Sequence, residues 1–147
     1  MTYLKSQHVS YVRNIQEQVK NFYSQKKKVK IYHGSTNSTR PLKFRKDEVV
    51  DVSALHNILE INISKNYVLV EPNVPMDRLV KETLKFGLVP PVVMEFPGIT
   101  AGGGVEGGAG ESSSFRFGLF HNCCLEYEVV LGNGEVILAS PNKKSDF

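Results

Sequence analysis

The feature that most constrains this chain is a run of glycine beyond its middle. Seven of the twelve glycines lie within residues 98–110. In the interior of a helix or strand, glycine costs about 0.5–1 kcal/mol relative to alanine, because it loses more conformational freedom on folding. We therefore predict that this stretch is neither a stable helix nor a packed strand. It should be backbone that bends tightly or approaches another group closely.

Two common phosphate-binding motifs fit this stretch poorly. No Gly-Lys-Ser/Thr sequence ends it, which excludes a Walker loop. Gly102, Gly104 and Gly107 satisfy the spacing G-x-G-x-x-G, but that fingerprint needs a strand before it and a helix directly after it. A proline and a glycine precede these residues, and residues 107–110 would break a following helix.

Two interpretations of the glycine-rich stretch remain. One is a flexible surface loop, which the composition alone favours. The other is a loop whose backbone N–H groups face a phosphate or a flat ring. Apolar residues border the stretch on both sides, at residues 90–94 and 115–120, and they favour a loop buried against a ligand.

A second candidate anion site follows an expected strand at residues 29–32. Its residues are Gly34, Ser35, Thr36, Asn37 and Ser38. Small residues let the backbone fold tightly, and the four polar side chains offer donors to phosphate oxygens. A polar turn explains the same residues equally well. Two such loops in one small domain are what a dinucleotide with a pyrophosphate requires.

Periodicity predicts an α+β domain. Apolar residues at spacings of three and four indicate a helix over 9–22, and a similar pattern indicates a helix over 76–86 that Gly87 terminates. Strands are expected at 49–52 and 67–70. An Asn-Gly turn predicts a hairpin of strands 127–131 and 136–139. So few strands leave an edge or face uncovered, so we expect a longer protein.

Composition and charge narrow the classes of partner. With 147 residues, 41% hydrophobic and 22% charged, the chain is typical of a globular domain. Residues 1–46 carry a net charge of +10 and residues 47–147 one of −7. The lysine run at 26–28 is interpreted as a solvated loop, because no nucleic-acid motif accompanies it. A weak attraction to an anionic membrane stays open.

The sequence shows neither a targeting segment nor a motif for hydrolase or metal chemistry. No apolar run approaches the roughly 20 residues of a membrane span, and residues 1–10 lack a secretory signal. We expect a cytoplasmic protein with no transmembrane segment, at most peripheral to an intracellular membrane. His121, Cys123 and Cys124 lack zinc-site spacing, so we interpret them as a loop histidine and two free thiols. His8 and His56 are expected on the surface.

Several segments, taken together, resemble a known flavoprotein family. Residues 31–38, 50–59 and 70–74 resemble the FAD-binding PCMH-type domain of the vanillyl-alcohol oxidase family. Residues 97–104 (PGITAGGG) and 111–121 (ESSSFRFGLFH) are similar to its Delta(24)-sterol reductase branch. The resemblance runs from about Val9 to the last residue.

The resemblance implies a fold, a cofactor and a chemistry. The fold is a PCMH-type FAD-binding domain of two small α/β subdomains, 1–60 with the pyrophosphate loop and 61–147 with the glycine-rich FAD loop, ending before a substrate (cap) domain. The chemistry is reduction of a C=C bond by hydride transfer through FAD, with NADPH as electron donor and a sterol as the small-molecule substrate. The alternatives are another PCMH-type flavin oxidase or dehydrogenase with a different substrate, and a non-catalytic fragment that keeps only the fold.

The resemblance also assigns cofactor-binding residues but no catalytic residue and no metal ligand. Relatives with covalent flavin carry a histidine in the early loop where this chain has Asn37, so non-covalent FAD is expected. The residues implied to bind FAD are Gly34, Ser35, Thr36, Asn37, Ser38, Thr100, Ala101, Gly102, Gly103, Gly104, Val105, Glu106, Gly107, Gly108, Ala109, Gly110, Glu111 and Ser112.

Overall fold

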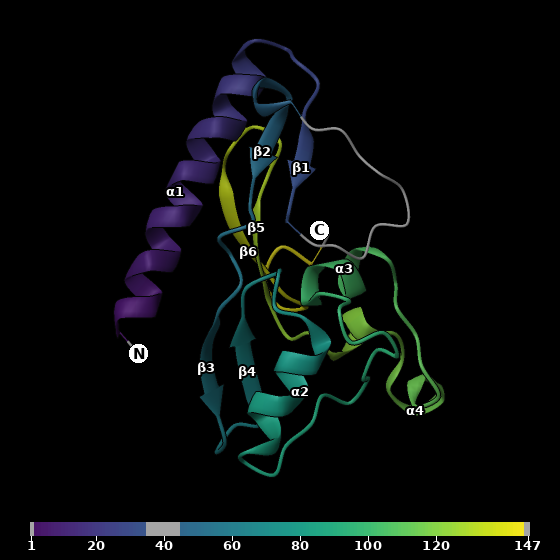
Figure 1. Cartoon of the computed structure of the whole chain (residues 1–147). Helices are drawn as coiled ribbons and strands as arrows, with labels where there is room; N and C mark the ends of the chain where they lie inside the picture. Colours follow the sequence, from purple (N-terminus) through teal and green to yellow (C-terminus); the bar gives the residue numbers. More distant parts are fainter. Residues whose placement is uncertain (1, 35–44, 146–147) are drawn as a thin grey trace.

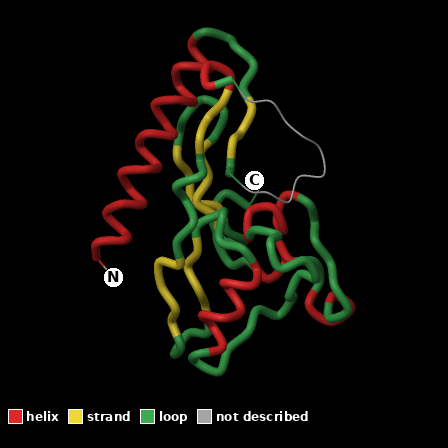
Figure 2. The backbone as a smooth tube through the Cα atoms, viewed as in Figure 1, coloured by secondary structure: helices red, strands yellow, loops and turns green. Residues whose placement is uncertain are grey.

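Helices and short strands are mixed along the chain, in keeping with the expected α+β class. The computed structural model describes residues 2–34 and 45–145. Within these residues the strands form three two-stranded sheets, and a long helix lies along one side of them (Figures 1 and 2). Short helical turns and loops on the other side of the molecule contain the glycine-rich stretch (Figure 1).

The first helix, α1 (Thr2–Ser24), confirms the amphipathic pattern of the sequence. Its residues Val12 and Ile15 are buried. Ile15 packs with Val50 and Leu55 in a small core, and Val130 from the C-terminal hairpin closes that core. The helix is thus held to elements from both ends of the chain.

The strand pairs confirm most of the expected strands. Strands β1 (Lys30–Tyr32) and β2 (Val49–Asp51) are parallel, with Ile31 opposite Val50. A one-turn 3-10 helix, Lys46–Glu48, precedes β2. The C-terminal hairpin consists of β5 (Tyr127–Val130) and β6 (Val136–Ala139), antiparallel as the Asn-Gly turn predicts.

One strand is absent from the sequence prediction. Strand β3 (Ile58–Asn62) pairs antiparallel with β4 (Tyr67–Val70), whose bounds were expected. The pairing shifts register between Ile58 and Glu60, which marks a β-bulge. A bulge interrupts the strict alternation of a half-buried strand, so the sequence of β3 lacks the usual signal.

The larger core lies under the second helix, α2 (Met76–Leu84). As expected, Gly87 follows the helix, and its N–H donates to the Leu84 carbonyl. The buried members of this core come from several segments between α2 and the C-terminal hairpin. They are Val74, Met76, Leu79, Val92, Met94, Ala101 and Phe120.

The prediction that residues 98–110 contain no stable helix is wrong. Helix α3 (Ala101–Glu106) lies inside this stretch and holds three of its glycines. The following elements are α4 (Ser114–Phe117) and a 3-10 helix, Phe120–Cys123. Intrinsic propensity disfavours α3, but hydrogen bonds and close packing to the rest of the molecule outweigh about 1 kcal/mol per glycine.

Candidate functional site

Helix α3 begins at a capping threonine. The Thr100 hydroxyl oxygen accepts a hydrogen bond from the Gly103 N–H at 3.2 Å, and the Thr100 carbonyl accepts one from the Gly104 N–H at 2.8 Å. A side-chain oxygen that satisfies an N–H in the first turn is the usual N-cap of a helix. Thr100 therefore fixes the start of α3 through its hydroxyl oxygen.

Two more amides of the first turn bond to the segment before α2. The Ala101 N–H donates to the Val74 carbonyl at 2.9 Å, and the Gly102 N–H donates to the Pro72 carbonyl at 2.8 Å. A Cβ on Gly102 would lie 2.9 Å from the Pro72 Cβ. Glycine at 102 is therefore required by the close approach of two backbones.

A third glycine is required by the core. A Cβ on Gly104 would overlap the Met94 sulfur and lie 3.0 Å from the Phe120 ring. Gly104 is buried, as is Ala101 on the same helix. Two of the three consecutive glycines thus serve packing, and only Gly103 is exposed.

The outward face of the stretch is almost bare backbone. Its exposed residues include Gly103, Glu106, Gly107, Gly110 and Ser112. Within the described ranges, the N–H groups of Gly110 and Ser112 have no hydrogen-bond acceptor. Exposed glycine backbone that carries the unbonded N–H groups of Gly110 and Ser112 can approach an anion or a flat ring closely.

Two residues after Gly110 are anchored to residues 91–95. A Glu111 carboxylate oxygen accepts from the Glu95 N–H at 2.7 Å, and the Ser113 hydroxyl donates to the Pro91 carbonyl at 2.9 Å. The Ser114 hydroxyl accepts from the Glu111 N–H. Of the three consecutive serines 112–114, Ser112 is therefore the one whose hydroxyl bonds no described residue.

The remaining predicted residues of this stretch are structural in position. Val105 and Ala109 pack against the larger core, and the Ala109 carbonyl accepts from the Phe120 N–H at 2.8 Å. Gly108 follows α3 with a positive φ of 57°.

The early loop begins at Gly34, directly after β1. Gly34 is exposed, has a φ of 71°, and would place a Cβ 3.1 Å from the Ser53 Cβ. A positive φ of this kind favours glycine over residues with side chains. Ser35, Thr36, Asn37 and Ser38 lie outside the described residues.

Both predicted loops are tied to one turn, residues 71–74, in which the Val74 N–H donates to the Glu71 carbonyl at 3.2 Å. The segment after β2 bonds to Asn73, and the Val52 N–H in that segment bonds to the Tyr32 carbonyl at the end of β1. Helix α3 bonds to the other side of the same segment through Pro72 and Val74. The fold therefore links the start of the early loop to the glycine-rich stretch through one strip of backbone.

A charged cluster around the buried Glu71 lies between α1 and residues 71–74, and the sequence prediction missed it. His8 Nδ1 is 2.9 Å from a Glu71 oxygen, and His8 Nε2 is 2.9 Å from a Glu128 oxygen. Glu71 is 1% exposed and also accepts from the Asn57 N–H at 2.6 Å. The carboxylates raise the pKa of His8, Glu128 first, and His8 lowers the pKa of Glu128.

The expectation of a surface His8 is thus wrong, whereas His56 is exposed as expected. Cys123 and Cys124 are free thiols. Burial raises the pKa of the Cys124 thiol, which makes it a weak nucleophile. Within residues 2–34 and 45–145, no three His, Cys, Asp or Glu side chains gather to bind a metal ion.

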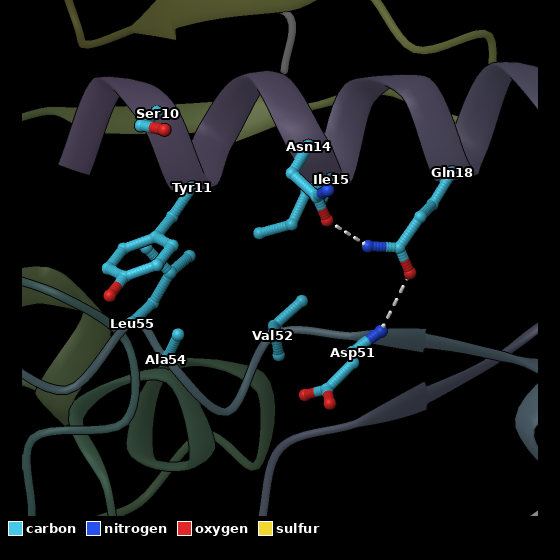
Figure 3. A pocket seen from close by; sticks show the side chains of 9 residues that line it. All are labelled: Ser10, Tyr11, Asn14, Ile15, Gln18, Asp51, Val52, Ala54 and Leu55. Atoms are coloured by element: carbon cyan, nitrogen blue, oxygen red, sulfur yellow. Dashed lines mark hydrogen bonds between the residues drawn. The ribbon is translucent and has the colours of Figure 1, made fainter. Parts of the chain in front are cut away.

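A shallow hollow lies elsewhere, between α1 and the segment after β2 (Figure 3). The Gln18 side chain spans it, accepting from the Asp51 N–H at 3.2 Å and donating to Asn14 (Figure 3). None of the predicted FAD residues that the structure describes lines this hollow. Among the described helices, none is long and apolar enough to cross a membrane.

Comparison with known proteins identifies the relatives of this chain. The sequence model of the FAD binding domain family matches residues 9–140. The Delta(24)-sterol reductase of Homo sapiens is 35% identical over 143 residues, which are 95% of this chain. The Delta(24)-sterol reductase of Arabidopsis thaliana is 40% identical over 98 residues, 66% of this chain and 18% of that protein.

A solved structure has the same fold. 6-Hydroxy-D-nicotine oxidase from Arthrobacter nicotinovorans superposes with a TM-score of 0.70 at 19% identity, over 88% of this chain and 28% of that one. This chain also covers only 28% of the human sterol reductase. It thus corresponds to the cofactor-domain part of longer flavoprotein relatives.

Proposed function

We propose that this chain, which belongs to the family of FAD-binding domains, holds FAD between the bare backbone of residues 100–112 and the loop that begins at Gly34. The observation that carries the proposal is the exposed strip at Gly103, Gly107 and Gly110, where no Cβ separates the backbone from a ligand. FAD, when bound, supplies the hydride chemistry of a flavin oxidoreductase.

The described residues fit such a group. The unbonded N–H groups of Gly110 and Ser112 and the Ser112 hydroxyl would donate to phosphate or ring oxygens. The amides of Ala101, Gly102 and Gly103 would instead keep α3 in place, because they bond within the protein. We also propose that Ser35, Thr36, Asn37 and Ser38 donate hydrogen bonds to the pyrophosphate.

In a longer protein of this kind, we propose that the bound FAD serves reduction of a sterol C=C bond, with NADPH as the electron donor. The name shared by the human and Arabidopsis relatives supports the sterol and the reduction. The two-subdomain division at residue 60, non-covalent attachment and weak peripheral membrane association belong to the same proposal.

The test is FAD binding by the purified chain and by variants of the exposed strip. The chain should retain FAD through gel filtration and absorb near ~450 nm, as a bound flavin does. Ser112→Glu places a negative charge beside the proposed diphosphate and should weaken FAD binding about tenfold or more. Ser64→Glu, in the exposed β3–β4 turn, is the matched control and should bind like the parent chain.

Gly103→Val adds bulk on the exposed face of α3 and should also abolish retention of FAD. Its matched control is Gly132→Val, in a hairpin turn where nothing lies within 4 Å of the new Cβ. Circular dichroism verifies that each variant is folded. A colourless parent chain that ignores added FAD, or equal affinity in the Ser112 and Ser64 variants, would contradict the proposal.

A further inference from the structure

Residues 71–74 form a short strip of backbone between two parts of the molecule, and this strip is a turn closed by the hydrogen bond from the Val74 N–H to the Glu71 carbonyl at 3.2 Å. On one side lies the segment after β2, residues 52–57, and on the other lies the first turn of α3. The strip itself carries a buried glutamate at one end, Glu71, and a buried apolar residue at the other, Val74. If residues 52–57 or the first turn of α3 moved relative to the strip, the distance between these two segments would change.

The contacts toward α3 are made by backbone and by packing. Pro72 and Val74 offer carbonyls to the first two amides of α3, and Pro72 touches Gly102 directly. Side-chain identity matters little to these two hydrogen bonds. Main-chain hydrogen bonds therefore hold α3 against the strip.

The contacts toward residues 52–57 depend on side chains. Asn73 Nδ2 donates to the Val52 carbonyl at 2.6 Å, while the Asn73 N–H donates to the Leu55 carbonyl at 2.9 Å. Glu71 accepts from Asn57 further along the same segment. Asn73 is half-buried, so its amide bond to Val52 is partly shielded from water.

Val52 links this contact to the early loop. Its N–H donates to the Tyr32 carbonyl at 2.8 Å, two residues before Gly34, and a Cβ added to Gly34 would lie 3.1 Å from the Cβ of its neighbour Ser53. A single side chain, that of Asn73, therefore bonds the residue that holds the end of β1. Asn73 also follows Pro72, whose carbonyl accepts a hydrogen bond from α3.

We propose that Asn73 is a positioning residue that sets the spacing between the two loops proposed to hold FAD. The inference rests on the proposed function, because it assigns Asn73 no contact with the cofactor. It acts through Val52 on the loop at Gly34 and through Pro72 on α3. A ligand that spans both loops binds tightly only when their spacing is preset.

The test compares FAD affinity in Asn73→Ala, Asn73→Asp and two controls at the hairpin turn. Asn133→Ala and Asn133→Asp are matched, because Asn133 makes one side chain-to-backbone bond, to the Glu135 N–H, far from both loops in the sequence. Titrations use a temperature at which urea unfolding shows every variant to be folded, so that lost stability does not lower the apparent affinity. Quenching of flavin fluorescence gives the Kd.

Both Asn73 variants should raise the Kd for FAD about tenfold, the effect expected for loss of one partly shielded hydrogen bond. The Asn73→Asp variant carries a further signature. At neutral pH its carboxylate repels the Val52 carbonyl, but below its pKa the protonated carboxyl can donate to that carbonyl. Its Kd, normalised to Asn133→Asp at each pH, should approach the parent value on acidification, whereas that of Asn73→Ala should not.

The outcomes separate this inference from the proposed function. If the parent chain binds FAD and Ser112→Glu weakens binding about tenfold or more, but Asn73→Ala binds with the parent Kd, the positioning role is wrong and the proposed function stands. A pH-independent Kd ratio in Asn73→Asp would also overturn the role. If the parent chain binds no FAD, both fail together.

Discussion

His8 shows how much a single side chain can join in a small domain. Its ring lies between the fully buried carboxylate of Glu71 and the partly exposed carboxylate of Glu128. With both ring nitrogens protonated, each N–H donates to one carboxylate. Burying Glu71 without such partners would be costly, because an isolated buried carboxylate loses its hydration. His8 therefore stabilises the docking of α1 onto two other elements.

The raised pKa of His8 makes this stabilisation depend on pH. A group whose pKa is higher in the folded state stabilises fully below its ordinary value of 6.5 and stops doing so as the pH rises through the raised value. Glu128, with a lowered pKa, acts in the opposite sense and loses its contribution only on strong acidification. Stability from this cluster should be greatest in mildly acidic solution.

We predict that His8→Gln lowers the free energy of unfolding at pH 6 by about 1.5–3 kcal/mol, the range for hydrogen bonds to charged groups. The difference from the parent chain should shrink as the pH rises through the raised pKa of His8, because the neutral ring then loses its attraction to the two carboxylates. Urea unfolding across this pH range measures it. His56→Gln, at an exposed histidine, is the control. A difference that grows with pH would contradict the assignment.

The sequence could not reveal this cluster. The partners of His8 are 63 and 120 residues away along the chain, and no local spacing connects them. Periodicity places His8 beside the apolar stripe of α1 but is silent on which element packs there. Glu71 was visible only as part of a resembling motif, with no sign that it is buried.

At the scale of elements, α3 depends on the packing of its glycines against the strip 71–74. We predict that Gly102→Ala lowers the free energy of unfolding by about 1–3 kcal/mol, because the new methyl group meets Pro72 at 2.9 Å and the backbone must move. Urea unfolding monitored by circular dichroism measures the loss. Gly132→Ala, with open space around the new methyl, should be neutral or slightly stabilising.

Equal stability of these two alanine variants would mean that the close approach at Gly102 is not required.

Some elements of the fold could be predicted from the sequence, and α3 could not. Apolar periodicity predicted α1 and α2, strand-forming residues predicted β4, and the Asn-Gly turn predicted the C-terminal hairpin, because each of these signals is local in the sequence. Helix α3 has no such pattern: its hydrogen bonds go to Pro72 and Val74, which lie about thirty residues earlier in the sequence.

At the scale of the whole molecule, two polypeptide stretches about seventy residues apart are connected through one shared strip. The residue types in those stretches were evident from the sequence, as were their glycines and polar side chains. The sequence could not show which of these residues bond or pack inside the protein and which face outward. Gly102, Gly104, Thr100 and Glu111 bond or pack inside the protein, whereas Gly103, Gly110 and Ser112 face outward.

Several large aromatic side chains are exposed on the surface of the molecule. Phe115 on α4 is 92% exposed, and Phe96 in the segment anchored to Glu111 is 63% exposed. The chain spans 28% of the human relative.

The most direct test of the account is amide hydrogen exchange of the chain with and without FAD. If one cofactor is held by both stretches, FAD should slow exchange in peptides covering residues 33–38 and 107–113 together, with the same dependence on FAD concentration. The peptide covering residues 131–136, in the hairpin turn, should exchange at an unchanged rate. Protection in only one of the two stretches, or in neither, would contradict the claim that they converge on one cofactor.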